Sequence, residues 1–321
     1  MKNEFLNKKI CFLGASNIQH GTFLTYLRSV LPQETYLFNR GLGGNRAEMA
    51  CALLQDEVFN LRPDYCFILY GTNDIGIWLY DQSLEVDEKA IAERNNRDER
   101  FLRGIAETVK ALKAAGVKPV LMSPWAVDEL LMEKDDIQTV ADNKEKEKRV
   151  TSNIYTRSTF RNINKKLAVY AEKVKSIAER EEIDFIDLYS NSYALLQKDR
   201  GLFGEDGIHL TDYGHQTFAK WIFEYLVGNS KTVVWQKSAR ALKIEEMEAV
   251  ERRVQYVKWA MFHPILGYDH SNLKLEIEEL LKEKASLSPQ RHANIETYLQ
   301  YKDDINTLRA NIWNAMTQEI E

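Results

Sequence analysis

The stretch KICFLGASN, residues 9–17, decides the fold class. A short apolar run ends at Gly14 and is followed by Ser16, a residue type that often begins helices. Other short apolar runs follow along the chain, each bounded by Gly, Pro, Asn or Asp and separated by helical patterns. Strands alternating with helices in this way predict a parallel sheet with helices on both faces. The predicted strands are 9–13, 36–38, 65–70, 119–122 and 183–188, and the predicted helices are 22–31, 46–59, 88–115, 156–181 and 212–227.

Length and composition are those of an ordinary folded protein. The 321 residues, 44% of them apolar and 28% charged, can bury a large core without disulfides or a structural metal. The net charge of −5 gives no electrostatic reason to expect a nucleic-acid partner. There are three cysteines without CxxC spacing, no leader-like apolar segment at the start and no apolar run of membrane-spanning length. We therefore expect a cytoplasmic protein with no membrane span.

A charged segment interrupts the alternation after the fourth predicted strand. Between residues 128 and 149, 13 of 22 residues are Asp, Glu, Lys or Arg. Such a run is typical of a solvated surface helix or loop. Because it leaves from the carboxyl end of a strand, it could instead form a lid over the ligand crevice.

After Gly228 the strand patterns stop and helical periodicity takes over. An apolar stripe recurs at steps of three and four along residues 244–261, and residues 263–267 should break that helix. Further helices are predicted from Ser271 and from Ser288, which precedes a proline. The sequence therefore predicts a first domain over residues 1–228 and a helical appendage over 229–321. The stripes of the appendage need a partner surface, either the first domain or a second copy in a homo-oligomer.

Four short motifs lie at predicted strand ends or in a late loop. They are GASN at 14–17, NRGLGGNR at 39–46, GTND at 71–74 and DGIHLT at 206–211. In a parallel sheet, the loops that leave the carboxyl ends of the strands form the ligand crevice. A serine, a histidine and a carboxylate are the groups that a serine hydrolase needs. Alone, each motif also has a structural explanation, as a helix cap, a flexible turn, a braced turn or a capping loop.

Together and in this order, the motifs resemble the blocks of the SGNH/GDSL hydrolases, a family named for its Ser, Gly, Asn and His. The resemblance covers residues 8 to about 227. It implies a flavodoxin-like, three-layer αβα sandwich with a five-stranded parallel sheet, to which the helical appendage is added. One departure is Ala15, which stands where the family usually has Asp. The loss of that Asp leaves open how the turn before the serine is braced.

The resemblance also implies roles for individual residues. Ser16 would be the nucleophile, His209 the general base and Asp206 the carboxylate that orients His209. The oxyanion hole would combine the backbone N–H groups of Ser16 and Gly44 with the side-chain amide of Asn73. Of two adjacent glycines we choose the second, because the family's Gly usually precedes a polar residue.

Two further residues, Asn45 and Trp125, could contact the substrate, although core packing explains Trp125 equally well. No histidine or cysteine spacing suggests a metal, and no cofactor is expected. The expected activity is hydrolysis of a short acyl ester, such as an acetyl ester, of a carbohydrate or other small molecule. The alternatives are a lysophospholipase or thioesterase, an acyltransferase with the same site, and a non-catalytic assembly protein built on a hydrolase fold.

Overall fold

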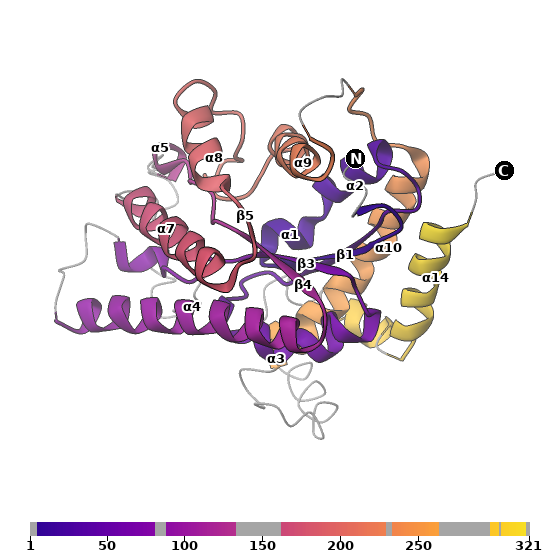
Figure 1. Cartoon of the computed structure of the whole chain (residues 1–321), viewed down its shortest axis with the longest axis horizontal. Helices are drawn as coiled ribbons and strands as arrows, with labels where there is room; N and C mark the ends of the chain where they lie inside the picture. Colours follow the sequence, from indigo (N-terminus) through magenta and orange to yellow (C-terminus); the bar gives the residue numbers. More distant parts are fainter. Residues whose placement is uncertain are drawn as a thin grey trace.

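A five-stranded parallel sheet with the strand order β2-β1-β3-β4-β5 lies at the centre of the molecule (Figure 1). The computed structural model describes residues 5–80, 88–132, 162–228, 233–262, 296–301 and 303–318. This architecture confirms the predicted α/β sandwich. The strands are β1 (Lys9–Gly14), β2 (Tyr36–Gly41), β3 (Tyr65–Leu69), β4 (Lys118–Met122) and β5 (Asp184–Ile186).

Helices cover both faces of the sheet because successive strand residues point to opposite sides. In β1, Ile10 and Phe12 enter one apolar cluster, whereas Cys11 and Leu13 enter the other. The first face packs against α1 (Ser16–His20), α2 (Thr22–Val30), α8 (Leu188–Leu196) and α9 (Asp212–Val227). The second face packs against α3 (Ala47–Glu57), α4 (Glu88–Ala114) and α7 (Ile163–Glu181). Short helical segments are η2 (Phe59–Leu61), η3 (Ile77–Tyr80) and α5 (Glu129–Met132).

Two strands, β2 and β5, end at least two residues away from their predicted ends. Strand β2 continues to Gly41, three residues beyond its predicted end at 38, and so includes the charged Arg40. The run predicted as a strand over 183–188 contains only the short β5, and α8 begins at its end. The side chain of Asp187 caps α8 by accepting a hydrogen bond from the backbone N–H of Ser190 at 2.9 Å. Gly21, with φ +74°, separates α1 from α2.

Several predictions fall on residues that the structure does not describe. Of the charged segment 128–149, only residues 128–132 are described, and four of them form α5. The choice between a surface helix and a lid therefore lies outside the described residues. The same holds for residues 156–161 at the predicted start of the helix that the structure shows as α7, for the break at 263–267 and for the helix starts at 271 and 288.

The C-terminal helices α10 (Ala239–Tyr256) and α14 (Ile305–Thr317) lie beside strand β2 (Figure 1). A π-helical segment, η4 (Val257–Phe262), continues α10. Ile244 of α10 and Ile312 of α14 join the apolar cluster on the second face of the sheet. The ring of Trp313 lies 5.0 Å from that of Tyr36 and 6.0 Å from that of Phe38, between centroids. The apolar stripes of the appendage could pack against the first domain or against a second copy of the chain. These contacts are with the first domain.

The buried face of α10 also carries charges, which form a buried ion cluster with residues of β2, α3 and α14. The carboxylate of Glu251 forms ion pairs with the guanidinium groups of Arg40, Arg252 and Arg309, at N···O distances of 2.6, 2.7 and 2.7 Å. Arg252 also pairs with the carboxylate of Glu57 at 2.5 Å. Burial alone would raise the pKa of Glu251, but the three guanidinium groups lower it well below its usual range. This cluster explains how Arg40 can occupy a strand position with only 2% exposure.

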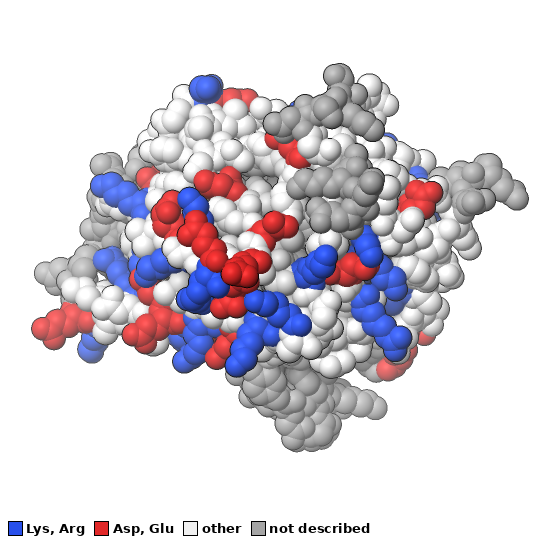
Figure 2. Space-filling view, viewed as in Figure 1, with Lys and Arg blue, Asp and Glu red and all other residues white. Residues whose placement is uncertain are grey.

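The face that carries α4 and α7 is a mixture of charges (Figure 2). Lys and Arg side chains alternate there with Asp and Glu, as in the pairs Arg100–Glu93 at 3.0 Å and Lys166–Asp98. Neither sign dominates this face. Among the described residues, no helix has the length and apolar composition needed to cross a bilayer.

Candidate active site

The first three sequence motifs meet at one edge of the sheet because their strands are neighbours. Ser16 follows β1 in the chain, Gly44 follows β2 and Asn73 follows β3. The strand order β2-β1-β3 places these three loops side by side at the carboxyl ends of parallel strands. Gly14 permits this arrangement, because a Cβ there would lie 2.6 Å from the backbone oxygen of Leu69.

Ser16, His209 and Asp206 form a continuous chain of hydrogen bonds. The Nε2 atom of His209 lies 2.8 Å from Ser16 Oγ, and its Nδ1 atom lies 2.5 Å from Asp206 Oδ2. The other carboxylate oxygen, Oδ1, accepts the backbone N–H groups of Ile208 and His209, both at 2.9 Å. Burial would raise the pKa of Asp206, but these bonds outweigh it and lower the pKa to about 2. The carboxylate is therefore charged at neutral pH and can hold a proton on Nδ1, which leaves Nε2 free to accept one.

Asn17 connects the serine turn to the histidine loop. Its Nδ2 atom donates to the backbone oxygen of Ile208 at 3.1 Å, and its Oδ1 atom accepts the backbone N–H of Leu210 at 3.0 Å. These two backbone groups flank His209, while Asn17 itself adjoins Ser16. Sequence reasoning quoted Asn17 only as part of the first motif and assigned it no role. Its position next to the serine was the one available signal.

A buried carboxylate supports the other side of the histidine loop. Gly207 adopts φ +69°, and a Cβ at this position would lie 2.4 Å from the backbone oxygen of Asp128. The backbone N–H of Asp128 donates to Gly207 O at 2.8 Å. Asp128 is only 4% exposed. Its carboxylate accepts hydrogen bonds from Nε of Arg200, at 2.8 Å, and from a terminal guanidinium nitrogen of the same residue. This ion pair therefore fixes the backbone that carries the turn between Asp206 and His209.

The glycine turn after β2 presents a backbone N–H at the same edge. Gly44 has φ +72°, and a Cβ built on it would meet nothing within 4 Å. The N–H of the adjacent Gly43 donates to Oε1 of Gln19 at 2.5 Å. The N–H of Gly44 has no hydrogen-bond acceptor among the residues that the structure describes. The N–H of Gly44 is therefore available to a ligand, whereas that of Gly43 already has an acceptor.

The side chain of Asn73 is fixed by the glycine turn. Its Nδ2 atom donates to the backbone oxygen of Asn45 at 3.0 Å, which uses one of its two amide hydrogens and leaves the other for a ligand. The side chain of Asn45 in turn donates to the hydroxyl of Tyr70 at 3.2 Å. Asn45 thus supports the site through its backbone, and its side chain is hydrogen-bonded to Tyr70, the residue that follows β3.

Asp74, which the sequence left as a brace of the turn, has that role in the structure. Its two carboxylate oxygens accept the backbone N–H groups of Ala47 at 2.8 Å and Gly71 at 2.9 Å. Burial raises the pKa of Asp74 to about 6, although both hydrogen bonds act to lower it. The carboxylate connects the turn that carries Asn73 to the start of α3.

Comparison with known proteins agrees with this geometry. The model of the GDSL-like Lipase/Acylhydrolase family matches residues 12–217, which include all four motifs. The chain belongs to this family. Membership in the GDSL-like family makes the protein a hydrolase that acts on ester bonds.

The structure is also similar to solved GDSL-like and esterase structures. BT4096, described as a gut microbial diltiazem-metabolizing enzyme, has a TM-score of 0.66 and 14% identity, with 98% of this chain and 96% of that chain covered. The acetyl xylan esterase AlAXEase has a TM-score of 0.48 and 20% identity, with 68% of this chain and 100% of that chain covered. The alignment with BT4096 covers nearly the whole chain, so the shared fold includes the C-terminal helices.

One curated relative matches a short part of the chain. The uncharacterized lipoprotein YqeF of Bacillus subtilis (strain 168) is 30% identical over 87 residues, which are 27% of this chain. The match spans 31% of that relative's length.

Two aromatic side chains, Trp125 and His20, pack against other rings in this GDSL-like fold. Trp125 is only 3% exposed, and its ring lies edge-on to Phe218 at 5.3 Å between centroids. Core packing thus accounts for the position of Trp125, and its contact with substrate stays a prediction. His20, the last residue of α1, stacks on the ring of His209 at 5.3 Å between centroids. Burial and the neighbouring His209 lower the pKa of His20.

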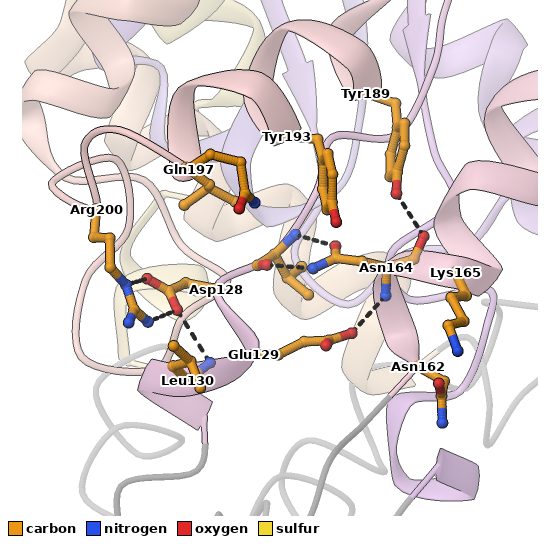
Figure 3. Close-up of a pocket in the computed structure, with 12 residues that line it drawn as sticks. Asp128, Glu129, Leu130, Asn162, Asn164, Lys165, Tyr189, Tyr193, Gln197 and Arg200 are labelled. Carbon is orange, nitrogen blue, oxygen red and sulfur yellow. Dashed lines mark hydrogen bonds and ion pairs between the residues drawn. The ribbon is translucent and has the colours of Figure 1, made fainter.

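A pocket of about 300 Å³ lies beside the histidine loop of this family member (Figure 3). The stacked rings of Tyr189 and Tyr193, 5.7 Å apart between centroids, extend toward Asn164. Gln197 and Arg200 line one side, and the pair of Arg200 with Asp128 joins this wall to the histidine loop. Within the described ranges, no group of three or more His, Cys, Asp and Glu side chains is placed to hold a metal ion.

Proposed function

We propose that this esterase hydrolyses acetyl or similarly short acyl esters of a carbohydrate or other small molecule, through an acyl-enzyme on Ser16. The observation that carries the proposal is the hydrogen-bonded chain from Ser16 Oγ through His209 to Asp206. No step of this chemistry needs a cofactor.

In the first half of the proposed reaction, Ser16 Oγ attacks the ester carbonyl carbon and its proton passes to His209 Nε2. The carbonyl π electrons move to the oxygen, which becomes an oxyanion. The N–H groups of Ser16 and Gly44 and the amide of Asn73 stabilise that charge. When the tetrahedral intermediate collapses, the C–O bond to the alcohol breaks, and His209 gives its proton to the departing oxygen.

In the second half, a water molecule takes the place of the alcohol. His209 accepts a proton from the water as its oxygen attacks the acyl carbon, and the same donors stabilise the second oxyanion. Collapse breaks the bond to Ser16 Oγ, which recovers a proton from His209. The products are a carboxylic acid and an alcohol. Asp206 stays ionised throughout, in accord with its lowered pKa of about 2.

The pocket beside the histidine loop is lined in part by groups that can bind a hydroxyl-bearing molecule, and Ser16, Asp206 and His209 are not among its lining residues. Its described lining combines tyrosine rings with amide and charged side chains. Amides and tyrosines provide both donors and acceptors for hydroxyl groups, and aromatic rings provide apolar faces. A lysophospholipase or thioesterase would instead need an apolar groove for its acyl chain.

A substrate panel tests the specificity. The rates kcat/KM for p-nitrophenyl acetate, butyrate, octanoate and palmitate should fall with chain length, and acetylated sugars should release acetate. Rates that rise with chain length would support a lysophospholipase or thioesterase and contradict the proposal. Transfer of the acetyl group to an added sugar in preference to water would support the acyltransferase alternative.

Removal of one oxyanion donor should slow the chemical step. Asn73→Ala is expected to lower kcat for p-nitrophenyl acetate by about 10²- to 10³-fold with a small change in KM, because the amide acts on charge that develops in the transition state. Steady-state kinetics measures both constants. Unchanged kcat would show that the turn carrying Asn73 is purely structural.

The oligomeric state and the location are separate proposals. We propose that the chain forms a homo-oligomer through its C-terminal helices, for which light scattering on the full chain is the test. We also propose a cytoplasmic location, to be tested by cell fractionation. A monomer by light scattering, or recovery in the membrane fraction, would contradict the respective proposal.

A further inference from the structure

We propose that Gln19 and Tyr256 are positioning residues that hold the glycine turn so that the N–H of Gly44 points at the oxyanion. The inference rests on the proposed function, since it assigns Gly44 as an oxyanion donor. It concerns two residues outside the four motifs, one on the nucleophile helix α1 and one at the end of the C-terminal helix α10.

Gln19 connects the nucleophile to the glycine turn. It lies three residues after Ser16 in α1, so the two side chains project from the same side of the helix. Its Oε1 atom accepts the N–H of Gly43 at 2.5 Å. The peptide unit that joins Leu42 to Gly43 is thereby tied to the helix that carries the nucleophile, one peptide unit before the N–H of Gly44. Gly44 has a positive φ and no side chain that could restrict its backbone conformation, so the restriction has to come from neighbouring residues.

Tyr256 supports the same glycine from the C-terminal helix. A Cβ built on Gly43 would lie 3.4 Å from Cε2 of Tyr256 and 3.3 Å from Oε1 of Gln19, so both side chains lie against this residue. Any residue larger than glycine at position 43 would press on both supports.

Helix α10 runs alongside the end of strand β2 and the glycine turn that comes after it, and contacts both. The backbone N–H of Asn39 donates to Glu248 at 3.2 Å, and the Arg40 side chain donates to Glu251 at 2.6 Å. The contact between Gly43 and Tyr256 comes next along both segments. The C-terminal helix therefore supports the strand end and the turn in succession, which gives it a part in building the oxyanion hole without supplying a reacting group.

The energetic reason is preorganisation. Oxyanion donors stabilise the transition state strongly only when they already point at the developing charge, because reorienting them during the reaction would cost free energy. A turn with two glycines is intrinsically mobile. Two supports from different elements restrict it before substrate binds.

Two variants test the inference. Gln19→Met removes the strong acceptor at similar side-chain volume, and Tyr256→Ala removes the ring. Each is expected to lower kcat for p-nitrophenyl acetate by about tenfold, less than loss of a whole donor, with KM changed by less than about twofold. Tyr256→Phe keeps the ring and should recover the activity that Tyr256→Ala loses. Leu242→Ala on the exposed face of α10, where the side chain is 40% exposed, is the matched control.

A thiono substrate separates a positioning role from a general structural one. In the thiono analogue of p-nitrophenyl acetate, the charge develops on sulfur, which accepts hydrogen bonds poorly, so oxyanion donors contribute little. The ratio of kcat/KM for the oxo ester to that for the thiono ester should therefore fall by about tenfold in Gln19→Met and Tyr256→Ala. Asn73→Ala, which removes a donor directly, should lower this ratio as well.

The possible outcomes are distinct. A lower ratio at unchanged melting temperature supports the inference. An unchanged ratio overturns it, whether kcat is unaffected or falls together with the melting temperature. If the wild type hydrolyses esters and Ser16→Ala does so equally well, the proposed function itself fails, and the inference fails with it.

Discussion

Ser16→Ala is expected to lower kcat/KM for p-nitrophenyl acetate by about 10⁴- to 10⁶-fold, because removal of a triad nucleophile abolishes the covalent route. The fold should be unchanged, since the substitution removes one hydroxyl from a half-buried position at the start of α1. Steady-state kinetics measures the rate, and circular dichroism with thermal melting checks the fold.

The matched control is Ser176→Ala. Ser176 lies on the exposed side of α7, and its hydroxyl donates only to the backbone oxygen of Glu172 one turn earlier. This variant should retain wild-type activity. Hydrolysis by Ser16→Ala within tenfold of the wild-type rate would exclude Ser16 as the nucleophile.

The second large effect concerns stability. Glu251→Ala is expected to lower the free energy of unfolding by about 3–5 kcal/mol, because it leaves the guanidinium groups of Arg40, Arg252 and Arg309 to share the one carboxylate of Glu57. Arg40 and Arg252 are 2% and 0% exposed, and Glu251 is their shared partner. Urea denaturation of the full chain, followed by circular dichroism, measures the change.

The control for this prediction is a surface ion pair. Glu181→Ala removes the partner of Lys113, whose side chain is 44% exposed, and should leave the urea midpoint nearly unchanged because exposed ion pairs contribute little to stability. Equal effects of the two variants would show that the buried ion cluster does not hold α10 to the sheet. Glu251→Gln, which keeps the shape of the side chain, should lie between the wild type and Glu251→Ala.

Where local pattern and tertiary role agree, the sequence was sufficient to predict the fold. Strands β1, β3 and β4 are apolar runs bounded by turn residues, and their identification was correct to within a residue or two. The four motifs could be placed at one sheet edge because parallel strands put their carboxyl ends together. The structure brings Ser16, His209 and Asp206 into hydrogen-bond contact.

Where a distant partner decides the structure, the sequence was not sufficient. The strand predicted over 36–38 ended before Asn39 and the charged Arg40, whereas β2 continues through both. A charge in a buried strand is unfavourable alone, and Glu251, 211 residues away, makes that of Arg40 favourable. The stripe predicted for α10 contained only apolar residues, whereas the buried face includes Glu248, Glu251 and Arg252. Gln19 gave no signal because a glutamine on a helix is usually a solvated side chain.

Covalent labelling tests the central claim most directly. A fluorophosphonate loses fluoride to an activated serine and leaves a stable phosphonyl adduct, which peptide mapping by mass spectrometry locates. We expect one adduct per chain, on Ser16, and no adduct in Ser16→Ala. Labelling of a different serine, or full ester hydrolysis by a chain that takes no label, would contradict the assignment of Ser16 as the nucleophile.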